Sequence, residues 1–150
     1  MTVISQIVAH VVTADTDHAS TGSWIYLGLG GREFSLDTYG VDFSRGADAH
    51  FRLGEDSNVK YSSYNDPRTP PLSIEDLRHF PVYLRMESAG DRAAWCLEWV
   101  SVTVDPDAGH RHRYTHPALA GRSSRHRIWL DTGYGKALYL RSDCEEAPRR

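Results

Sequence analysis

Apolar and polar residues alternate with a period close to two along most of this 150-residue chain. Such alternation is typical of β-strands that bury one face, and its clearest example is Glu-Trp-Val-Ser-Val-Thr-Val at 98–104. A β-branched stretch at 4–12 is less regular but also predicts a strand. The remaining segments with strand character are 24–27, 34–36, 50–53, 82–86, 127–130 and 137–140. The pattern therefore predicts short strands joined by turns along nearly the whole chain.

Turn residues separate these predicted strands. Gly-Leu-Gly-Gly at 28–31 follows a strand, lacks the third glycine of a dinucleotide-binding fingerprint and precedes no helix. It therefore predicts a hairpin turn with positive φ angles, not a phosphate-binding loop. Asp-Thr-Gly-Tyr-Gly at 131–135 predicts a second hairpin, between the last two strands. Ser73 followed by Asp76, behind two prolines, predicts one short helix near residues 73–79.

Length and composition agree with one folded domain. A chain of 16.9 kDa with 40% hydrophobic residues can bury roughly 68–70% of its unfolded surface without metals or disulfides. Its apolar runs are far shorter than the roughly 20 residues of a membrane-spanning helix, and its start lacks the basic region of a secretion signal. We therefore expect an all-β fold, an antiparallel β-sandwich of about eight strands over residues 1–143, with a frayed tail at 144–150 and a cytoplasmic location.

The charge is distributed unevenly along the chain. A net charge of −3 and a pI of about 6.2 argue against a dedicated nucleic-acid-binding protein, so we expect no nucleic-acid partner. Residues 108–130 include no acid, so this segment carries +5 and the rest of the chain carries −8. Its five arginines are Arg111, Arg113, Arg122, Arg125 and Arg127. A basic segment of this kind can steer a protein onto an anionic surface.

Histidines also gather in this basic segment. His110 and His112 would point the same way from a strand and could hold a transition metal. The flanking arginines would repel the cation, and no cysteine or carboxylate is near in sequence. We therefore expect a solvated basic loop over 110–116.

No catalytic arrangement is recognisable in the sequence. A G-x-S-x-G motif is missing, and no paired carboxylates stand at active-site spacing. Cys96 lies between two large apolar residues, a setting typical of packing, and we expect Cys96 and Cys144 to be reduced thiols. The sequence therefore favours a protein that is not an enzyme.

Two carboxylates flank a glycine in the segment Asp-Thr-Tyr-Gly-Val-Asp-Phe at 37–43. In a tight turn Asp37, Asp42 and the Gly40 carbonyl can converge on one point. Calcium takes about six to eight oxygen ligands, so loops at 13–21 and 87–91 would have to contribute the remainder. The alternative is that these residues only make turns closed by Asx hydrogen bonds. Both interpretations stay open on spacing alone.

Short motifs along about residues 5–130 follow a recognisable order. They are Thr-Ala-Asp at 13–15, Ala-Ser-Thr-Gly-Ser at 19–23, Ile-Tyr-Leu at 25–27, Phe-Ser-Arg-Gly-Ala-Asp-Ala-His-Phe at 43–51, the loop and tryptophan at 87–95, Val-Ser-Val at 100–102 and Trp-Leu at 129–130. Together they resemble the PLAT domain, the lipoxygenase-homology sandwich found in lipoxygenases, lipases, polycystins and clostridial phospholipase toxins. The Asp in the segment 43–51 stands one place early relative to the family pattern.

The resemblance implies an eight-stranded antiparallel sandwich whose loops bind membranes or protein partners, often with calcium. The turn at 37–43 resembles the toxin-type calcium loop of that family. The residues that the resemblance assigns to a calcium site are Thr21, Asp37, Gly40, Asp42 and Asp91. Gly22 replaces a usual acid and Glu87 stands where the family prefers Asp, so a module that has lost the metal is the alternative.

We therefore expect a non-catalytic module that binds an anionic lipid or membrane surface, assisted by calcium and associated peripherally with the membrane. The alternative is a stand-alone protein-interaction domain on the same fold, without metal. Tyr39 would sit at the headgroup level beside the calcium loop, whereas Tyr61 and Tyr64 in the long loop suit a partner surface. The five arginines offer a contact that needs no metal. The four tryptophans, Trp24, Trp95, Trp99 and Trp129, lie in predicted strands and are expected in the core.

Overall fold

The computed structural model describes residues 2–88, 94–108, 112–119, 127–131, 133 and 135–143. Its described part contains nine strands and two short 3₁₀ helices. The strands are β1 Gln6–Thr13, β2 Trp24–Leu29, β3 Arg32–Ser35, β4 Asp48–Gly54, β5 Val82–Glu87, β6 Trp95–Val104, β7 His112–Thr115, β8 Ile128–Leu130 and β9 Ala137–Ser142. The helices are η1 Ile74–Arg78 and η2 Pro117–Leu119. No helix in the described ranges has the length and apolar character needed to cross a membrane.

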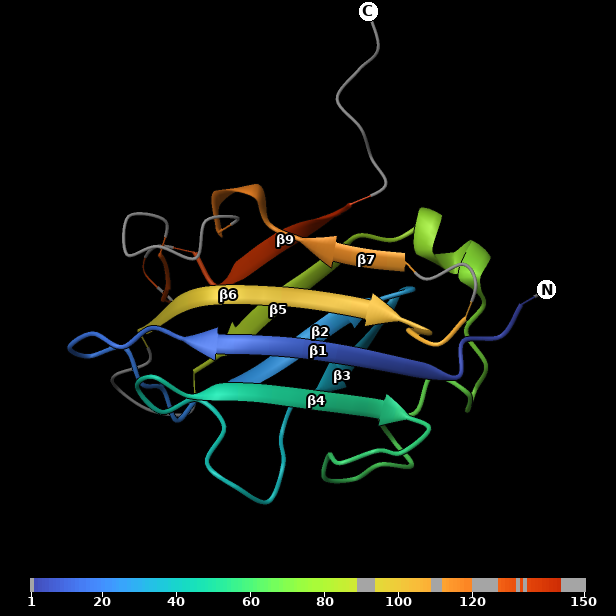
Figure 1. Cartoon of the computed structure of the whole chain (residues 1–150), viewed down its shortest axis with the longest axis horizontal. Helices are drawn as coiled ribbons and strands as arrows, with labels where there is room; N and C mark the ends of the chain where they lie inside the picture. Colours follow the sequence, from blue (N-terminus) through green and yellow to red (C-terminus); the bar gives the residue numbers. More distant parts are fainter. Residues whose placement is uncertain are drawn as a thin grey trace, which may run out of the picture.

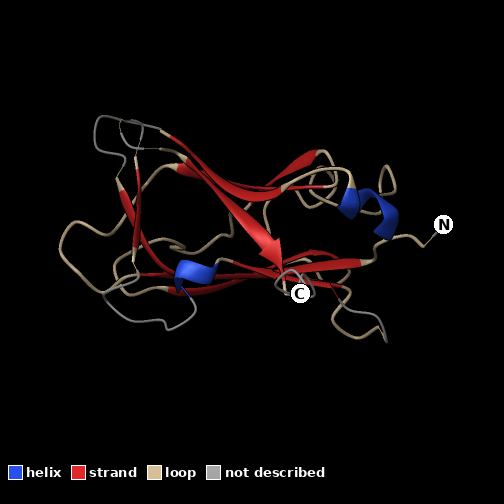
Figure 2. Ribbon diagram, turned by 90° about the horizontal axis from the view of Figure 1, so that it is seen from above, coloured by secondary structure: helices blue, strands red, loops and turns tan. Residues whose placement is uncertain are grey.

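The strands form two stacked antiparallel layers (Figures 1 and 2). The front layer of Figure 1 has the order β4-β1-β6-β7, with β8 beside the first part of β6. The back layer has the order β3-β2-β5-β9. The last strand, β9, pairs with β5 and also with the end of β7, so the two layers are one sheet that folds over along this side. The all-β antiparallel sandwich expected from the sequence is confirmed.

The core lies between the layers and follows from the alternation along each strand. On β1, Ile7, Ala9 and Val11 are fully buried, while the residues between them face outward. Trp95 at the start of β6 is also fully buried and packs edge-on against Phe43, with ring centroids 5.3 Å apart. Its indole N–H donates to the Thr13 hydroxyl at 2.9 Å, so the one polar atom of the ring has a partner inside the core.

The placement of the tryptophans is only partly as expected. Trp95 is in the core and Trp99 is half-buried. Trp24 and Trp129 remain substantially exposed, because both stand on outward-facing positions of their strands. Alternation in a strand assigns residues to faces, but it does not say which face is buried when both carry large side chains.

Two local predictions are confirmed. The turn between β2 and β3 consists of Gly30 and Gly31, with φ angles of 62° and 83°, as a two-residue hairpin turn requires. The short helix expected near 73–79 is η1, and the Asp76 carboxylate accepts a hydrogen bond from the Ser73 backbone N–H at 2.8 Å. The second 3₁₀ helix, η2, carried no such signal in its sequence.

Two other predictions were wrong. The segment expected as a solvated basic loop contains strand β7, which pairs with β6 and β9 and buries Tyr114 against the core. One apolar residue in a four-residue strand is too weak a pattern to detect, and the pairing is supplied by the preceding strand β6 and by β9. The last two strands do not form a hairpin either, because β8 pairs with β6 in the front layer and β9 pairs with β5 in the back layer. Only the bridge between Asp131 and Gly135 remains of that turn. The tail at 144–150 lies outside the described residues.

Candidate functional site

The structure brings four of the five residues proposed for calcium to one open pocket. The pocket has a volume of about 250 Å³ and lies where β2 begins and the loop after β3 leaves the sheet. Its lining includes Thr21 from the β1–β2 loop and Asp37, Gly40 and Asp42 from the β3–β4 loop. Asp91 lies outside the described residues.

Local hydrogen bonds shape the β3–β4 loop. The Asp42 carboxylate accepts from the Thr38 backbone N–H at 2.8 Å and from the Thr38 hydroxyl through its other oxygen. The Gly40 N–H in turn donates to the Thr38 hydroxyl oxygen at 3.2 Å. Buried Leu36 and Phe43 anchor the two ends of the loop in the core. A turn closed by a side chain is thus present, but the Thr38 hydroxyl closes it and not an aspartate, and the two bonds from Thr38 hold Asp42 at the pocket.

The donor chemistry of this pocket suits a hard cation. Its described lining includes two carboxylates, three hydroxyls and two glycines that can offer their carbonyls, and no basic side chain. Asp37 has one basic neighbour outside the lining, since the Lys60 ammonium is 3.7 Å from its carboxylate. A calcium ion would therefore replace Lys60 as the partner of Asp37 and would take its remaining oxygens from water and from residues beyond this set.

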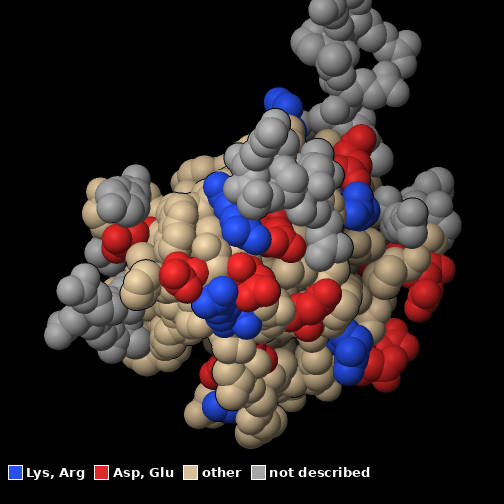
Figure 3. All heavy atoms as spheres, turned by 60° about the vertical axis from the view of Figure 1, so that its left-hand side comes forward, with Lys and Arg blue, Asp and Glu red and all other residues tan. Residues whose placement is uncertain are grey.

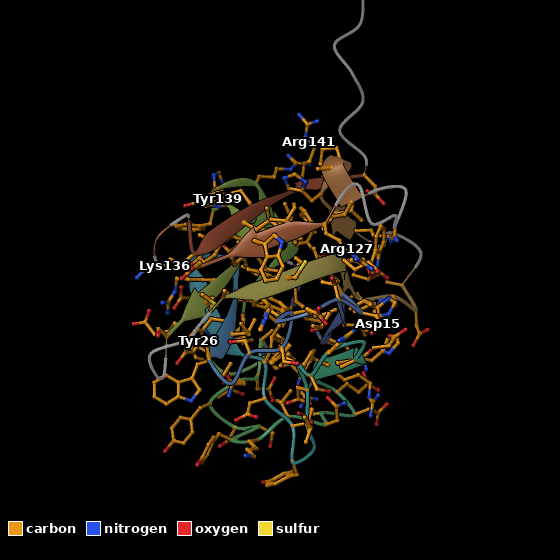
Figure 4. The ribbon with its side chains drawn as sticks, turned by 90° about the vertical axis from the view of Figure 1, so that its left-hand side faces the viewer. Asp15, Tyr26, Arg127, Lys136, Tyr139 and Arg141 are labelled. Carbon is orange, nitrogen blue, oxygen red and sulfur yellow. The ribbon has the colours of Figure 1, made fainter. Side chains whose placement is uncertain are left out.

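The carboxylates of the β1–β2 loop that were considered as further donors are already paired. Arg45 donates to Asp15 through Nε at 2.8 Å and to Asp17 through Nη1 at 2.9 Å. Asp15, in the loop after β1, is labelled in Figure 4 on the side of the molecule opposite the labelled Tyr26 and Lys136. These two acids stabilise the loop around Arg45, so the pocket depends on Asp37 and Asp42 for its negative charge.

Large apolar side chains project from the loops around the pocket. Tyr39 and Val41 at the tip of the β3–β4 loop are 84% and 83% exposed. Tyr61 and Tyr64, in the loop that follows β4, are 71% and 81% exposed. Lys60 joins the two loops, because its N–H donates to the Asp37 carbonyl at 2.7 Å and its ammonium lies 5.5 Å from the centre of the Tyr39 ring. We call Tyr39, Val41, Tyr61 and Tyr64 the loop-tip residues; both loops extend beyond the edge strand β4 (Figure 1).

The basic segment contributes less free charge than the sequence suggests. Arg113 on β7 forms an ion pair with Asp143 at 2.6 Å, and Arg127 pairs with Glu98 at 3.3 Å. The remaining three arginines of the segment, Arg111, Arg122 and Arg125, lie outside the described residues. In the view of Figure 3, acidic and basic side chains are interspersed and form no continuous basic surface among the residues drawn in colour.

A second, larger pocket lies around η1, at the other end of the strands from the β1–β2 loop (Figure 1). Its volume is about 550 Å³, and its lining combines apolar residues with two arginines, Arg78 and Arg141, and two histidines, His79 and His112. None of the described residues that line it carries a carboxylate. Sequence reasoning missed this pocket because its residues come from η1, β7 and β9, and no single segment carries the pattern. Its charge suits an anion.

Comparisons with known proteins give matches among solved structures only. No model of a protein family matches the chain, and no curated protein matches it in sequence. The α-toxin of Clostridium absonum is 25% identical with a TM-score of 0.50, over 69% of this chain and 26% of the toxin. The Clostridium perfringens α-toxin from avian strain SWCP is 18% identical with a TM-score of 0.51, over 73% of this chain and 27% of the toxin.

A lipoxygenase matches over more of the chain. Coral 8R-lipoxygenase is 15% identical with a TM-score of 0.58, over 91% of this chain, and it is described as activated by calcium through a C2-like domain. The match covers 17% of that enzyme, so this chain spans about a quarter or less of each of these larger proteins. The resemblance seen in the sequence is therefore confirmed as a likeness of fold: this chain is folded like the β-sandwich domains of these toxins and of the lipoxygenase.

Proposed function

We propose that this protein is a non-catalytic module that binds the surface of an anionic lipid membrane through its loop-tip residues. The observation that supports this most is the exposure of Tyr39 and Val41, at 84% and 83%, directly beside a pocket lined by two carboxylates. Isolated exposed apolar residues are ordinary, but a loop tip with two of them next to further exposed tyrosines is typical of an interaction surface. Tyrosine favours the headgroup region, where its ring is buried and its hydroxyl stays wet.

Calcium assistance is the second part of the proposal. Without an ion, the carboxylates of Asp37 and Asp42 repel anionic headgroups that approach the loop tips. A bound calcium ion becomes the largest local charge and reverses this field. Asp37, Asp42, the Thr21 hydroxyl and the Gly40 carbonyl would hold it, with Asp91 as a further ligand. The calcium activation described for the coral enzyme's C2-like domain supports this part.

Vesicle co-sedimentation tests both parts. We expect the protein to pellet with phosphatidylcholine vesicles that contain phosphatidylserine when calcium is present, and to stay in solution when a chelator is added. Asp37→Asn and Asp42→Asn should each weaken calcium-dependent binding, because each removes one formal charge from the ion site. Asp107→Asn is the matched control, since Asp107 is an exposed aspartate in the loop after β6 and does not line the pocket.

Other outcomes would assign the binding differently. Vesicle binding that resists the chelator but is lost in high salt would reject the calcium part and indicate the pocket around η1 as the contact. In that case Arg78→Gln and Arg141→Gln should weaken vesicle binding. Failure to bind any vesicle, with or without calcium, would reject the lipid proposal. A stand-alone protein-interaction domain would then be the remaining hypothesis, with the long loop around Tyr61 and Tyr64 as its contact.

A further inference from the structure

Two histidines and an aspartate meet on the outer face of the front layer. His10 on β1 and His50 on β4 are directly opposite each other in the antiparallel register. Asp48 precedes His50 by two residues on β4, so its side chain leaves the same face of the sheet. The His10 Nε2 atom is 2.6 Å from the Asp48 Oδ1 atom, and the His50 Nδ1 atom is 3.9 Å from the same oxygen.

The geometry points to a transition-metal site: we propose that His10, Asp48 and His50 bind a zinc-type divalent cation. Their ligand atoms all lie within 4.8 Å of one another, and within the described residues this is the one group of three or more metal-ligating side chains found so close together. Ligands of a tetrahedral zinc ion are about 3.3 Å apart, given bond lengths of about 2.0–2.2 Å. Rotation of the imidazole rings out of their stacked arrangement, with a small movement of the Asp48 carboxylate, would complete the site.

The backbone already holds the ligands in register, and the side chains have room to adjust. β1 is paired on both sides, with β4 and β6, so the Cα position of His10 is fixed. The two imidazole rings are stacked with centroids 4.1 Å apart and planes 7° from parallel. The side chains of Asp48 and His50 are 54% and 55% exposed, which leaves them free to turn toward a shared ion. Solvent above the sheet can supply the fourth ligand.

The donor set also decides which ions fit. Two imidazole nitrogens and one carboxylate suit zinc, cobalt, nickel or copper, whereas calcium and magnesium need mostly oxygen ligands. Arg52, two residues beyond His50 on β4, is a basic neighbour, and its Nε donates to the Asp56 carbonyl at 3.0 Å, which directs the guanidinium toward that loop. The site is thus different in chemistry from the pocket around Asp37 and Asp42, and the two proposals stand independently.

Calorimetric titration with zinc chloride tests the proposal, and a second titration with cobalt chloride is followed by visible absorption. We expect one zinc ion per chain, and His10→Gln, Asp48→Asn and His50→Gln should each weaken binding by about tenfold or more. Asp48 and His50 are exposed on an edge strand, so these two variants should fold normally even if the variant of half-buried His10 does not. Circular dichroism of each variant checks this.

Matched controls separate this site from other histidines and from the calcium proposal. His79→Gln and His112→Gln change histidines that are outside the group and should leave zinc affinity unchanged. Asp37→Asn should also leave it unchanged, and excess calcium should not compete. The proposal would be overturned if the unaltered protein bound no zinc, or if Asp48→Asn and His50→Gln both bound zinc as tightly as the unaltered protein. Loss of zinc binding only in His112→Gln would also overturn it.

Discussion

Removal of the apolar loop tip is the most direct perturbation of the proposed membrane contact. In the double variant Tyr39→Ala/Val41→Ala, both altered side chains are more than four-fifths exposed in the free protein. Their removal should therefore change the free energy of unfolding by no more than about 0.5 kcal/mol. Any large loss of vesicle binding must then come from the bound state.

The expected loss of binding free energy follows from the apolar groups that the two substitutions remove. Val41→Ala removes two carbon groups, which are worth about 0.8 kcal/mol each on full burial and about half of that at an interface. Tyr39→Ala removes an aromatic ring, and partial burial of a ring in the headgroup region contributes on the order of 1 kcal/mol. The sum is about 2 kcal/mol, which corresponds to about a thirtyfold weaker partition into the membrane.

The assay is partition into vesicles of fixed composition at saturating calcium, measured over a range of lipid concentrations. Tyr139→Ala is the control, because Tyr139 is also exposed, at 61%, but lies on the outer side of the back layer, as Figure 4 shows. We expect the control to bind like the unaltered protein. If the double variant folds normally and its partition coefficient stays within threefold of the original, the loop tips do not enter the membrane and the reasoning above is wrong.

Three further predictions concern the stability of the fold and the pKa of Tyr83. Thr13→Val leaves the buried Trp95 N–H without its acceptor and should lower the free energy of unfolding by about 1–3 kcal/mol, which corresponds to a fall in Tm of roughly 2–4 °C for each kcal/mol. Thr13→Ser keeps a hydroxyl acceptor and should retain most of the stability. Melting curves of Thr13→Val that equal those of the unaltered protein would contradict this. The hydrogen bond to Glu33 raises the pKa of Tyr83 to about 12, so its contribution is complete below about pH 10 and is lost as the pH rises toward 12; in urea titrations at several pH values, Tyr83→Phe should lack this loss. A Cβ atom at position 28 would overlap the Tyr83 ring, so Gly28→Ala should displace the ring and return the pKa of Tyr83 toward its ordinary value, as ultraviolet titration of tyrosinate would show.

Local patterns made most of the strands predictable. A strand that buries one face alternates residue by residue, and this period can be read within a single segment such as 98–104. The turn at Gly30 and Gly31 is equally local, because few other residues adopt two successive positive φ angles. The Asp42 side chain likewise bonds Thr38 only four residues away, so a turn closed by side chains in this loop was predictable as an alternative, although the hydroxyl of Thr38 closes it and not an aspartate.

Long-range pairing decided the features that the sequence could not show. Strand β7 is held by β6 and β9, and its four residues carry too little apolar pattern of their own. The two strands expected as a hairpin, β8 and β9, are separated because each pairs with a different layer. In both cases the pairing is made with residues outside the segment itself, and a local period holds no information about it.

The chain's own sequence therefore determined an alternating all-β domain, its glycine turn, its short capped helix and an acidic loop with an exposed tyrosine. Only the folded structure decided which segments meet. It placed Thr21 beside Asp37 and Asp42 at one pocket, neutralised Arg113 and Arg127 with acids, and set His10 opposite His50 across two strands. The physical reason is that the faces of a strand follow from a local repeat, whereas a site follows from the register between strands, which depends on the packing of the whole core.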